Sequence, residues 1–277
     1  MFFLLEMVAI GGLTGILSGL LGVGGGFVMI PLLNAAGVLM REAVGLSLLY
    51  VAFTCASGTF RHFRLGTVDP LLAFVLISGA TPMAPVGSHY ATILPNSVLE
   101  IVFAVIAIGA TAAYMGWGRY PQPVGDDLTG MSTPSHRWHI TFRRRRVKNE
   151  DLCYRVNILC AFALGLCLGF VSGLLGVGGG WLLVPLLVLA MHIPLLIAVG
   201  TSLFAIMGPA VVGAASHWRL GNLDLRASTP LVLSGIMGAQ LGALLVVRVP
   251  ALWIERLLVF LLMVASAYML GQGLGIF

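Results

Sequence analysis

Eight stretches of the chain are long, apolar and free of charged residues, and they restrict the fold more than any other feature. They cover residues 7–33, 43–60, 71–99, 101–118, 156–191, 193–216, 227–247 and 257–277. Only 9% of the residues are charged, against about a quarter in soluble domains, so a soluble fold would have almost no polar surface. About 20 apolar residues cross a bilayer as a helix. The sequence therefore predicts an all-α polytopic membrane protein with about eight transmembrane helices.

The chain also repeats itself. The segment Ser18–Gly26 recurs without change as Ser172–Gly180, at an offset of 154 residues. With the offset raised to 155, the match continues through an A-V-G-x-S-L motif and a basic H-[FW]-R-L-G motif. These matches predict two homologous four-helix repeats, 1–117 and 153–277, which are joined by a polar, basic linker, 118–152.

The basic residues predict how the chain lies in the membrane. If each apolar run crosses once, twelve of the fifteen Lys and Arg residues fall on one side. Basic residues favour the cytoplasmic side, so we expect a multi-pass protein of the bacterial inner membrane with both termini and the linker in the cytoplasm. The run Arg143–Arg146 suits contact with anionic lipids better than contact with nucleic acid, and we expect no nucleic-acid partner.

Whether each unit crosses the membrane an even or an odd number of times decides the relative orientation of the two units. Four crossings per unit place both units the same way up, with both H-[FW]-R-L-G loops in the cytoplasm. The first run of each unit, 7–33 or 156–191, is longer than a single crossing requires and contains a glycine cluster. It leaves open a second arrangement, in which a helix, a break and a re-entrant half-helix change this count.

The glycine clusters predict a break in the first helix of each unit. Each has five glycines within eight positions, followed by Pro31 or Pro185. Glycine weakens a helix by roughly 1 kcal/mol relative to alanine. A break at membrane depth is tolerated only inside protein or along a cavity, and paired breaks indicate the substrate site of a transporter. The glycines also suit close helix packing. The predicted binding residues are Ser18, Gly24, Gly25, Gly26, Ser47, Ser172, Gly178, Gly179, Gly180, Thr201 and Ser202.

Other polar residues give weaker signals. His62, Arg64, His217 and Arg219 follow the two A-V-G-x-S-L helices, and either recruit anions at an inner vestibule or only set the topology. Gln240 lies inside an apolar run, where an amide needs a hydrogen-bonding partner or a cavity.

The apolar runs contain no grouping of His, Asp or Glu residues of the kind that catalysis or metal binding requires. Acidic residues lie near the ends of these runs, so we expect no catalytic residues, no metal and no cofactor. The single lysine, Lys148, lies in the linker, and no P-loop accompanies the glycines. The sequence therefore predicts a protein that is not an enzyme and that takes energy from gradients.

The doubled G-L-L-G-V-G-G-G-x₄-P-L-L motif, each copy followed by A-V-G-x-S-L and by H-x-R-L-G with a later Asp, resembles the sulfite exporter TauE/SafE family. The resemblance covers both units and omits only the linker. It implies secondary transport of small anions, often sulfur-containing ones such as sulfite, thiosulfate or organosulfonates.

An inside-negative potential favours anion export by about 2.3 kcal/mol per charge per 100 mV, so export is the expected direction. A proton-coupled importer and a non-transport assembly or sensor protein remain as alternatives. The expected partners are a small anion and the lipid bilayer, and the sequence leaves a homodimer open.

Overall fold

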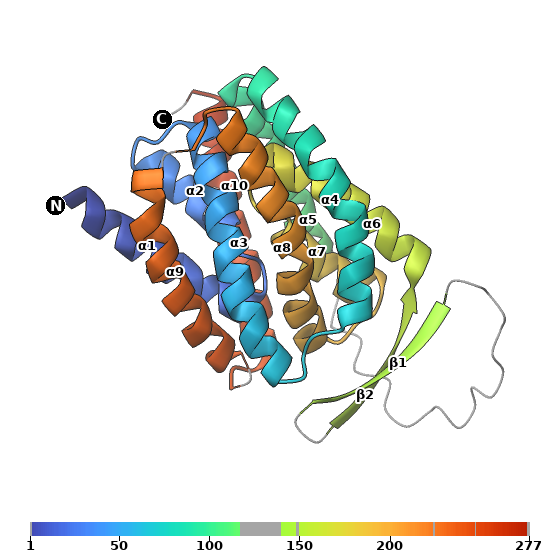
Figure 1. The fold of residues 1–277 in the computed structure, drawn as a ribbon. Coiled ribbons are helices and arrows are strands. Elements are labelled where there is room, and N and C mark those ends of the chain that lie inside the picture. The colour runs from blue at the N-terminus through green and yellow to red at the C-terminus, as the bar shows by residue number, and fades with distance from the viewer. Residues whose placement is uncertain (1, 117–139, 148–149, 224, 247, 276–277) are drawn as a thin grey trace.

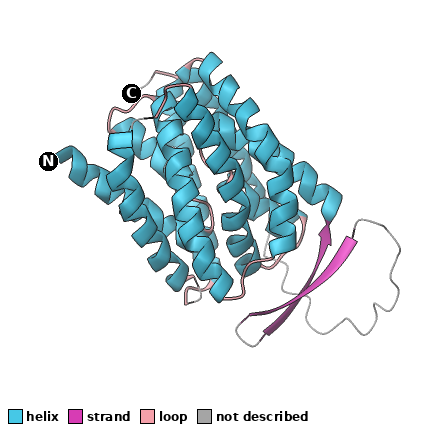
Figure 2. Ribbon diagram, viewed as in Figure 1, coloured by secondary structure: helices cyan, strands magenta, loops and turns pink. Residues whose placement is uncertain are grey.

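The computed structural model describes residues 2–116, 140–147, 150–223, 225–246 and 248–275. The first unit contains α1 (Phe2–Leu21), α2 (Gly26–Ala35), α3 (Met40–Arg64), α4 (Pro70–Ile93) and α5 (Asn96–Gly116). A hairpin of β1 (Ile140–Val147) and β2 (Glu150–Asn157) precedes the second unit (Figure 2). That unit contains α6 (Ile158–Leu175), α7 (Gly180–Pro185), the π-helical turn η2 (Leu186–Ala190), α8 (Leu195–Arg219), α9 (Leu225–Leu245) and α10 (Ala251–Gly273).

Six helices in the described ranges are long and apolar enough to cross a membrane, namely α3, α4, α6, α8, α9 and α10. Shorter apolar helical segments lie in α1, α2, α5 and α7–η2. The predicted helical, multi-pass membrane fold is therefore present, with the β1–β2 hairpin as an addition that the sequence did not predict. The predicted count of about eight transmembrane helices is not confirmed, and each unit has a second, short helix after the break in its first.

The extra helix begins at the glycine cluster. α1 ends at Leu21 and α2 begins at Gly26, and Gly22, Gly24 and Gly25 between them have φ of 72°, 79° and 76°. The corresponding glycines of the second unit have φ of 72°, 74° and 78°. Glycine enters this left-handed region without the steric cost that a Cβ brings. Both predicted breaks are thus real, and each reverses the chain.

Contacts along the first break show where the chain turns. Gly22 lies against Val199, near the start of α8, whereas Gly24 lies against Val51 and Cys55, in the middle of α3. α2 then leads to the start of α3, which lies at the end of the bundle opposite to the start of α8 and to Gly22. α1 and α2 therefore form a re-entrant hairpin whose two ends lie on the same side.

This hairpin inverts the second unit. α3 and α8 pack antiparallel, because Gly58 faces Leu203 while Gly213 faces Leu48. Gly58 and Gly213 are repeat counterparts, 155 positions apart, and so are Leu48 and Leu203. The two contacts are therefore equivalent, as a two-fold axis between the units requires. The prediction that both units face the same way is therefore wrong. The reason is that α1–α2 returns to its starting side, which leaves an odd number of crossings per unit.

The bundle has two distinct ends (Figure 1). The hairpin end carries β1–β2 and the loop after α3, since the Tyr154 hydroxyl donates to Asp69 Oδ2 at 2.7 Å. The terminal end carries both chain termini (Figure 1) and the loop after α8. The prediction placed the linker and the termini on one side. The structure places them at opposite ends, again because each unit crosses an odd number of times.

The two units interlock through their glycine ridges. α1 packs parallel to α9, and α6 packs parallel to α4, with backbone in contact with backbone. In the second pair, a Cβ on Gly165 would lie 2.5 Å from the Leu76 carbonyl, and Gly169 and Gly173 meet Ala80 and Ala84 in the same way. The ridge glycines, which share a small-xxx-small spacing, are therefore packing residues.

The segment between the units contains a β-hairpin. β1 and β2 pair antiparallel from Ile140 with Asn157 to Val147 with Glu150. Of the predicted linker, 118–152, residues 140–147 and 150–152 lie in these strands, and β2 continues to Asn157. Residues 118–139 of that linker lie outside the described residues.

The inverted arrangement can be tested by cysteine labelling. In a variant whose native cysteines are replaced by serine, Arg64→Cys and Arg219→Cys each supply one exposed thiol. We expect a membrane-impermeant maleimide to label these two thiols from opposite sides of sealed vesicles, because Arg64 ends α3 and Arg219 ends α8. Labelling after permeabilisation is the control. Labelling of both from one side would contradict the inversion.

Candidate functional site

The two glycine breaks meet at the centre of the molecule. A Cβ on Gly26 would lie 2.9 Å from the carbonyl oxygen of Val177, and one on Gly180 would lie 2.7 Å from Val23 Cα. Val51 of α3 contacts both breaks, through Gly24 and Gly178. The predicted glycines of both units thus come together, and their lack of side chains is what allows the crossing.

Three predicted serines lie at these breaks with their hydroxyls unpaired. Ser18, Ser47 and Ser172 are fully buried, and their Oγ atoms have no hydrogen-bond partner among the described residues. Ser18 Cβ is 3.3 Å from where a Cβ on Gly25 would lie, and Ser47 Oγ is 2.8 Å from the same position on Gly26. A buried hydroxyl without a partner costs about 1–3 kcal/mol. These groups are therefore available to a ligand.

The other two predicted hydroxyls have structural partners. Ser202 Oγ donates to the Gly22 carbonyl, and so fixes the end of the first break against α8. Thr201 Oγ1 accepts from the Asp69 N–H at 2.9 Å. Ser47 is the repeat counterpart of Ser202, so only one of these two equivalent serines is engaged. Thr201 and Ser202 position the breaks and offer less to a ligand.

The start of α2 adds backbone donors. The first N–H groups of a helix have no partner within it, and Gly25, the N-cap residue, provides no side-chain cap. The helix dipole also favours negative charge at this end. α2 thus presents a partial positive charge beside Ser18 and Ser47, in a region where the structure describes no fully buried arginine.

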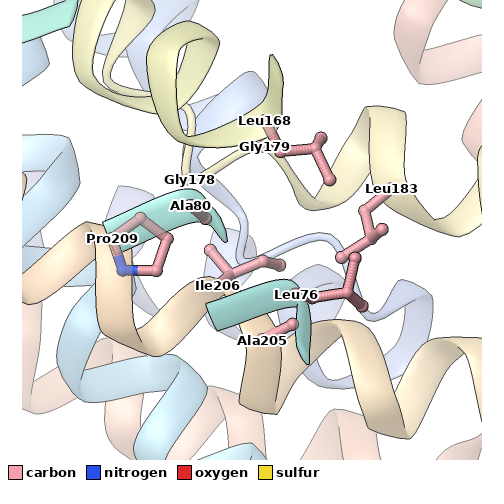
Figure 3. Close-up of a pocket in the computed structure, with 9 residues that line it drawn as sticks. All are labelled: Leu76, Ala80, Leu168, Gly178, Gly179, Leu183, Ala205, Ile206 and Pro209. Carbon is pink, nitrogen blue, oxygen red and sulfur yellow. The ribbon is translucent and has the colours of Figure 1, made fainter. Parts of the chain in front are cut away.

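A small cavity adjoins the second break (Figure 3). Its lining is apolar and comes from α4, α6, α7, α8 and the break itself: Leu76, Ala80, Leu168, Gly178, Gly179, Leu183, Ala205, Ile206 and Pro209. It has space for roughly one water molecule. Only its two glycines were among the predicted site residues.

The histidine and arginine pairs do not share a vestibule. His62 is buried at the hairpin end, where Nδ1 lies 2.8 Å from Thr67 Oγ1 and Nε2 lies 3.3 Å from the Gly19 carbonyl. His217 is buried at the terminal end, with Nε2 3.4 Å from the Gly173 carbonyl. The prediction put both on one side, and the inversion of the units separates them.

Each of these histidines instead joins the end of its own helix to a ridge helix of the same unit. Arg64 and Arg219 are exposed, and the Arg64 guanidinium lies 4.5 Å from the centre of the Phe60 ring. None of these four residues therefore contacts the breaks. His62 and Arg64 lie at the hairpin end of the bundle, and His217 and Arg219 lie at the terminal end.

Gln240 has the hydrogen-bonding partner that the sequence required. Its Nε2 donates to the carbonyl oxygen and to Oγ of Ser57, both at 2.9 Å. This contact joins α9 to α3 away from the breaks, so Gln240 is a packing residue and lies outside the site.

Sequence reasoning missed two residues near the breaks. Trp181 is fully buried, and its Nε1 has no hydrogen-bond partner within the described chain. It replaces Phe27 of the first unit, and this exchange inside an otherwise matching motif was the available signal. Ala205, which lines the cavity, replaces Tyr50, and that difference is also visible when the repeats are aligned.

The fold and the site together define a multi-pass membrane protein with two inverted units and two re-entrant hairpins that meet inside it. The chain belongs to the sulfite exporter TauE/SafE family, whose sequence profile matches residues 7–150 and 160–275. This confirms the resemblance that the doubled motif indicated.

Relatives extend over nearly the whole chain. Probable membrane transporter protein YunE of Bacillus subtilis is 25% identical over 97% of both chains. A probable membrane transporter protein of Xylella fastidiosa is 27% identical, over 90% of this chain and 87% of the relative. Another from Methanocaldococcus jannaschii is 26% identical over 91% and 83%. No solved structure matches this chain. The names of these relatives indicate a membrane transporter and not an enzyme.

Proposed function

We propose that the protein is a secondary transporter of small anions whose substrate site lies where the two breaks meet. The observation that carries this proposal is the set of three buried hydroxyls at that place, Ser18, Ser47 and Ser172, for which the described part of the chain offers no hydrogen-bond partner. A folded protein rarely leaves buried donors unpaired unless a ligand, a water or an ion satisfies them. Their position beside two broken helices favours a transported ligand over a structural water.

The polarity of the site supports an anion. The hydroxyls can donate, the α2 N-terminus carries a partial positive charge, and the breaks expose backbone N–H groups. Helix termini and neutral donors hold an anion without the desolvation cost of a buried arginine. An anion held in this way can also leave, which transport requires.

The family supports small sulfur-containing anions such as sulfite or organosulfonates as substrates, and export as the direction. The membrane potential alone drives export of an anion, by about 2.3 kcal/mol per charge per 100 mV. Uptake would need co-transported cations. Proton-coupled import is therefore the second candidate, and export requires the fewest additional components.

We propose an orientation in the bacterial inner membrane from the described arginines. Strand β1 with Arg143–Arg146, together with Arg61 and Arg64, lies at the hairpin end, whereas Arg41 and Arg219 lie at the terminal end. The positive-inside rule then places the hairpin end in the cytoplasm, where β1 lies close enough to the bilayer to meet anionic lipids. Both termini would lie on the outer side.

Tracer flux into proteoliposomes tests this function. With labelled sulfite or sulfoacetate, we expect uptake that follows an imposed inside-positive potential, since roughly 100 mV favours a fiftyfold gradient of a monovalent anion. The double variant Gly25→Leu/Gly179→Leu should lose this flux, because both glycines have positive φ and a Cβ on Gly25 would lie 2.7 Å from the Thr14 carbonyl.

Each other outcome has a defined meaning. Flux that persists in the folded double variant would place the pathway elsewhere. Flux that ignores the potential would contradict electrogenic transport. Wild-type protein that is folded yet moves neither anion would reject the sulfur-anion assignment, and small carboxylates would be the next probes.

A further inference from the structure

The two breaks are not equivalent, although the sequences that form them are identical. The repeat offset allows each residue around the second break to be compared with its counterpart around the first. A cavity adjoins the second break, whereas the counterpart of its lining residue Ala205 at the first break is the buried side chain of Tyr50. The difference between the units therefore lies in the side chains that pack around the glycines.

At the first break, Tyr50 fills the space. Its side chain is fully buried, and a ring carbon lies 3.3 Å from where a Cβ on Gly25 would be. The ring also packs against Gly235 of α9. The Tyr50 hydroxyl donates to the Gly11 carbonyl at 2.8 Å and lies 2.7 Å from Thr14 Oγ1. The ring thus has apolar contacts and its hydroxyl has two partners, so this place is closed.

At the second break, the corresponding residues leave the space open. Ala205 stands where the first unit has Tyr50, and Leu168 stands where it has Thr14. Ala80 replaces Gly235, the residue against which the tyrosine ring packs. Both Ala205 and Leu168 line the cavity, as Gly178 and Gly179 do (Figure 3). The cavity is therefore a remnant of the space that a tyrosine side chain fills in the other unit.

The wall of this cavity selects what can enter it. All nine lining residues are apolar or glycine, so a charged group there would lose its hydration without gaining donors from side chains. An apolar cavity of this kind instead accepts an apolar group. Donors lie close by in the chain: Ser172 is one helical turn after Leu168, and Trp181 is two residues after Gly179. Both have buried polar atoms without a hydrogen-bond partner in the ranges that the structure describes.

We propose that this cavity is the specificity pocket of the transporter, and that it accepts a methyl-sized apolar group of an organic anion whose charged end is held by the donors at the breaks. Ala205 is the residue that determines this specificity. The proposal rests on the proposed function, because it concerns the same site. It narrows the substrate to an anion that carries one small apolar substituent, with a sulfonate or a carboxylate as its charged end.

Competition between matched anions tests the pocket. Methanesulfonate and acetate carry one methyl group, whereas sulfite and formate are their counterparts without it. In proteoliposomes we expect flux of the methyl-bearing member of each pair to exceed that of its counterpart by about tenfold, as expected for one methyl group in an apolar pocket. Comparison within a pair measures the preference of the protein for the methyl group. Comparison between the sulfonate and carboxylate pairs measures its preference for the charged group.

Two variants of Ala205 alter the pocket in opposite directions. Ala205→Val fills it and should remove the tenfold preference, because the methyl group then has no space in the pocket. Ala205→Gly enlarges it and should shift the preference toward ethanesulfonate or propionate. Tyr50→Phe is the matched control in the first unit, since it keeps the ring, and it should leave the preference unchanged. Equal loss of both members of a pair in folded Ala205→Val, or no change in either, would overturn the proposal.

A binding measurement keeps this test separate from the test of transport. In a variant without native cysteines, Ala205→Cys places a thiol in the pocket, which methyl methanethiosulfonate can modify. Methanesulfonate or acetate should slow this modification at least fivefold, and sulfate at equal ionic strength should not. Protection without flux would reject the transport function and retain the pocket, whereas flux without protection would retain transport and reject the pocket.

Discussion

Replacement of Ser18, Ser47 and Ser172 together by alanine is expected to reduce anion flux at least roughly 100-fold, with no loss of thermal stability. A hydrogen bond to a charged group contributes about 1.5–3 kcal/mol, so three such donors account for a loss of this size. Stability is retained because these hydroxyls have no hydrogen-bond partner in the described structure, and removal of a buried, unpaired polar group costs nothing in hydrogen bonding.

Loss of flux together with unchanged stability distinguishes a role of the three serines in binding from a role in folding. Single variants should each lower flux by roughly tenfold, with the thermal unfolding midpoint unchanged in detergent. Tracer flux in proteoliposomes and thermal unfolding of the same preparations measure the two quantities.

Ser202→Ala is the matched control for the triple variant. Its hydroxyl donates to the Gly22 carbonyl, so its loss should destabilise the protein by about 1–3 kcal/mol, the cost of leaving a buried carbonyl unpaired. A triple serine variant that loses stability but keeps its flux per folded molecule would show that the hydroxyls are structural and that the site lies elsewhere.

Gly169→Leu is expected to prevent correct folding. Gly169 contacts Ala80 of α4 backbone to backbone, and a Cβ at this position would fall 2.6 Å from Ala80 Cα. Helix α6 would have to leave α4, and with it the glycine contacts on either side, so the cost should exceed the ~3 kcal/mol that is usual for overpacking. The measurement is the monodisperse fraction after detergent extraction and size-exclusion chromatography.

Gly109→Leu is the corresponding control on α5. A Cβ there would have nothing within 4 Å, and leucine is favoured over glycine within a helix by about 1 kcal/mol. This variant should therefore express and purify like wild type. Equal behaviour of the two leucine variants would contradict the close packing of α4 and α6.

The helices and the breaks could be predicted from the sequence, but the orientation of the second unit could not. Apolar length shows that a segment lies in the bilayer, and clustered glycines show where a helix ends. Residues 7–33 remain equally apolar whether the chain continues across or turns back at Gly22. The direction depends on contacts such as Gly22 with Val199, which join distant parts of the chain. This one ambiguity changed the parity, the side of each loop and the side of the termini.

The candidate site was predicted in part. Ser18 and Ser172 lie inside the repeated motif, and their place at the breaks followed from it. Ser47 and Ser202 are equivalent in sequence, yet only Ser202 has a partner in the structure, and no pattern distinguishes them. Likewise, alignment of the two repeats shows that Ala205 corresponds to Tyr50, but only the packing shows that this difference leaves a cavity.

The cross-unit glycine contacts also define what can move as one body. α1 packs directly on α9, and α6 packs directly on α4, without intervening side chains. Each of these helix pairs therefore takes one helix from each repeat, and is a tightly packed body assembled from both repeats.

A solitary repeat would leave its ridge glycines exposed to lipid and could cover them only by meeting a second copy that was inserted upside down. The present chain corresponds to such an antiparallel pair joined end to end. Because α1–α2 returns to its starting side, α6 begins at the end of the bundle where α5 ends, and one polypeptide supplies both orientations.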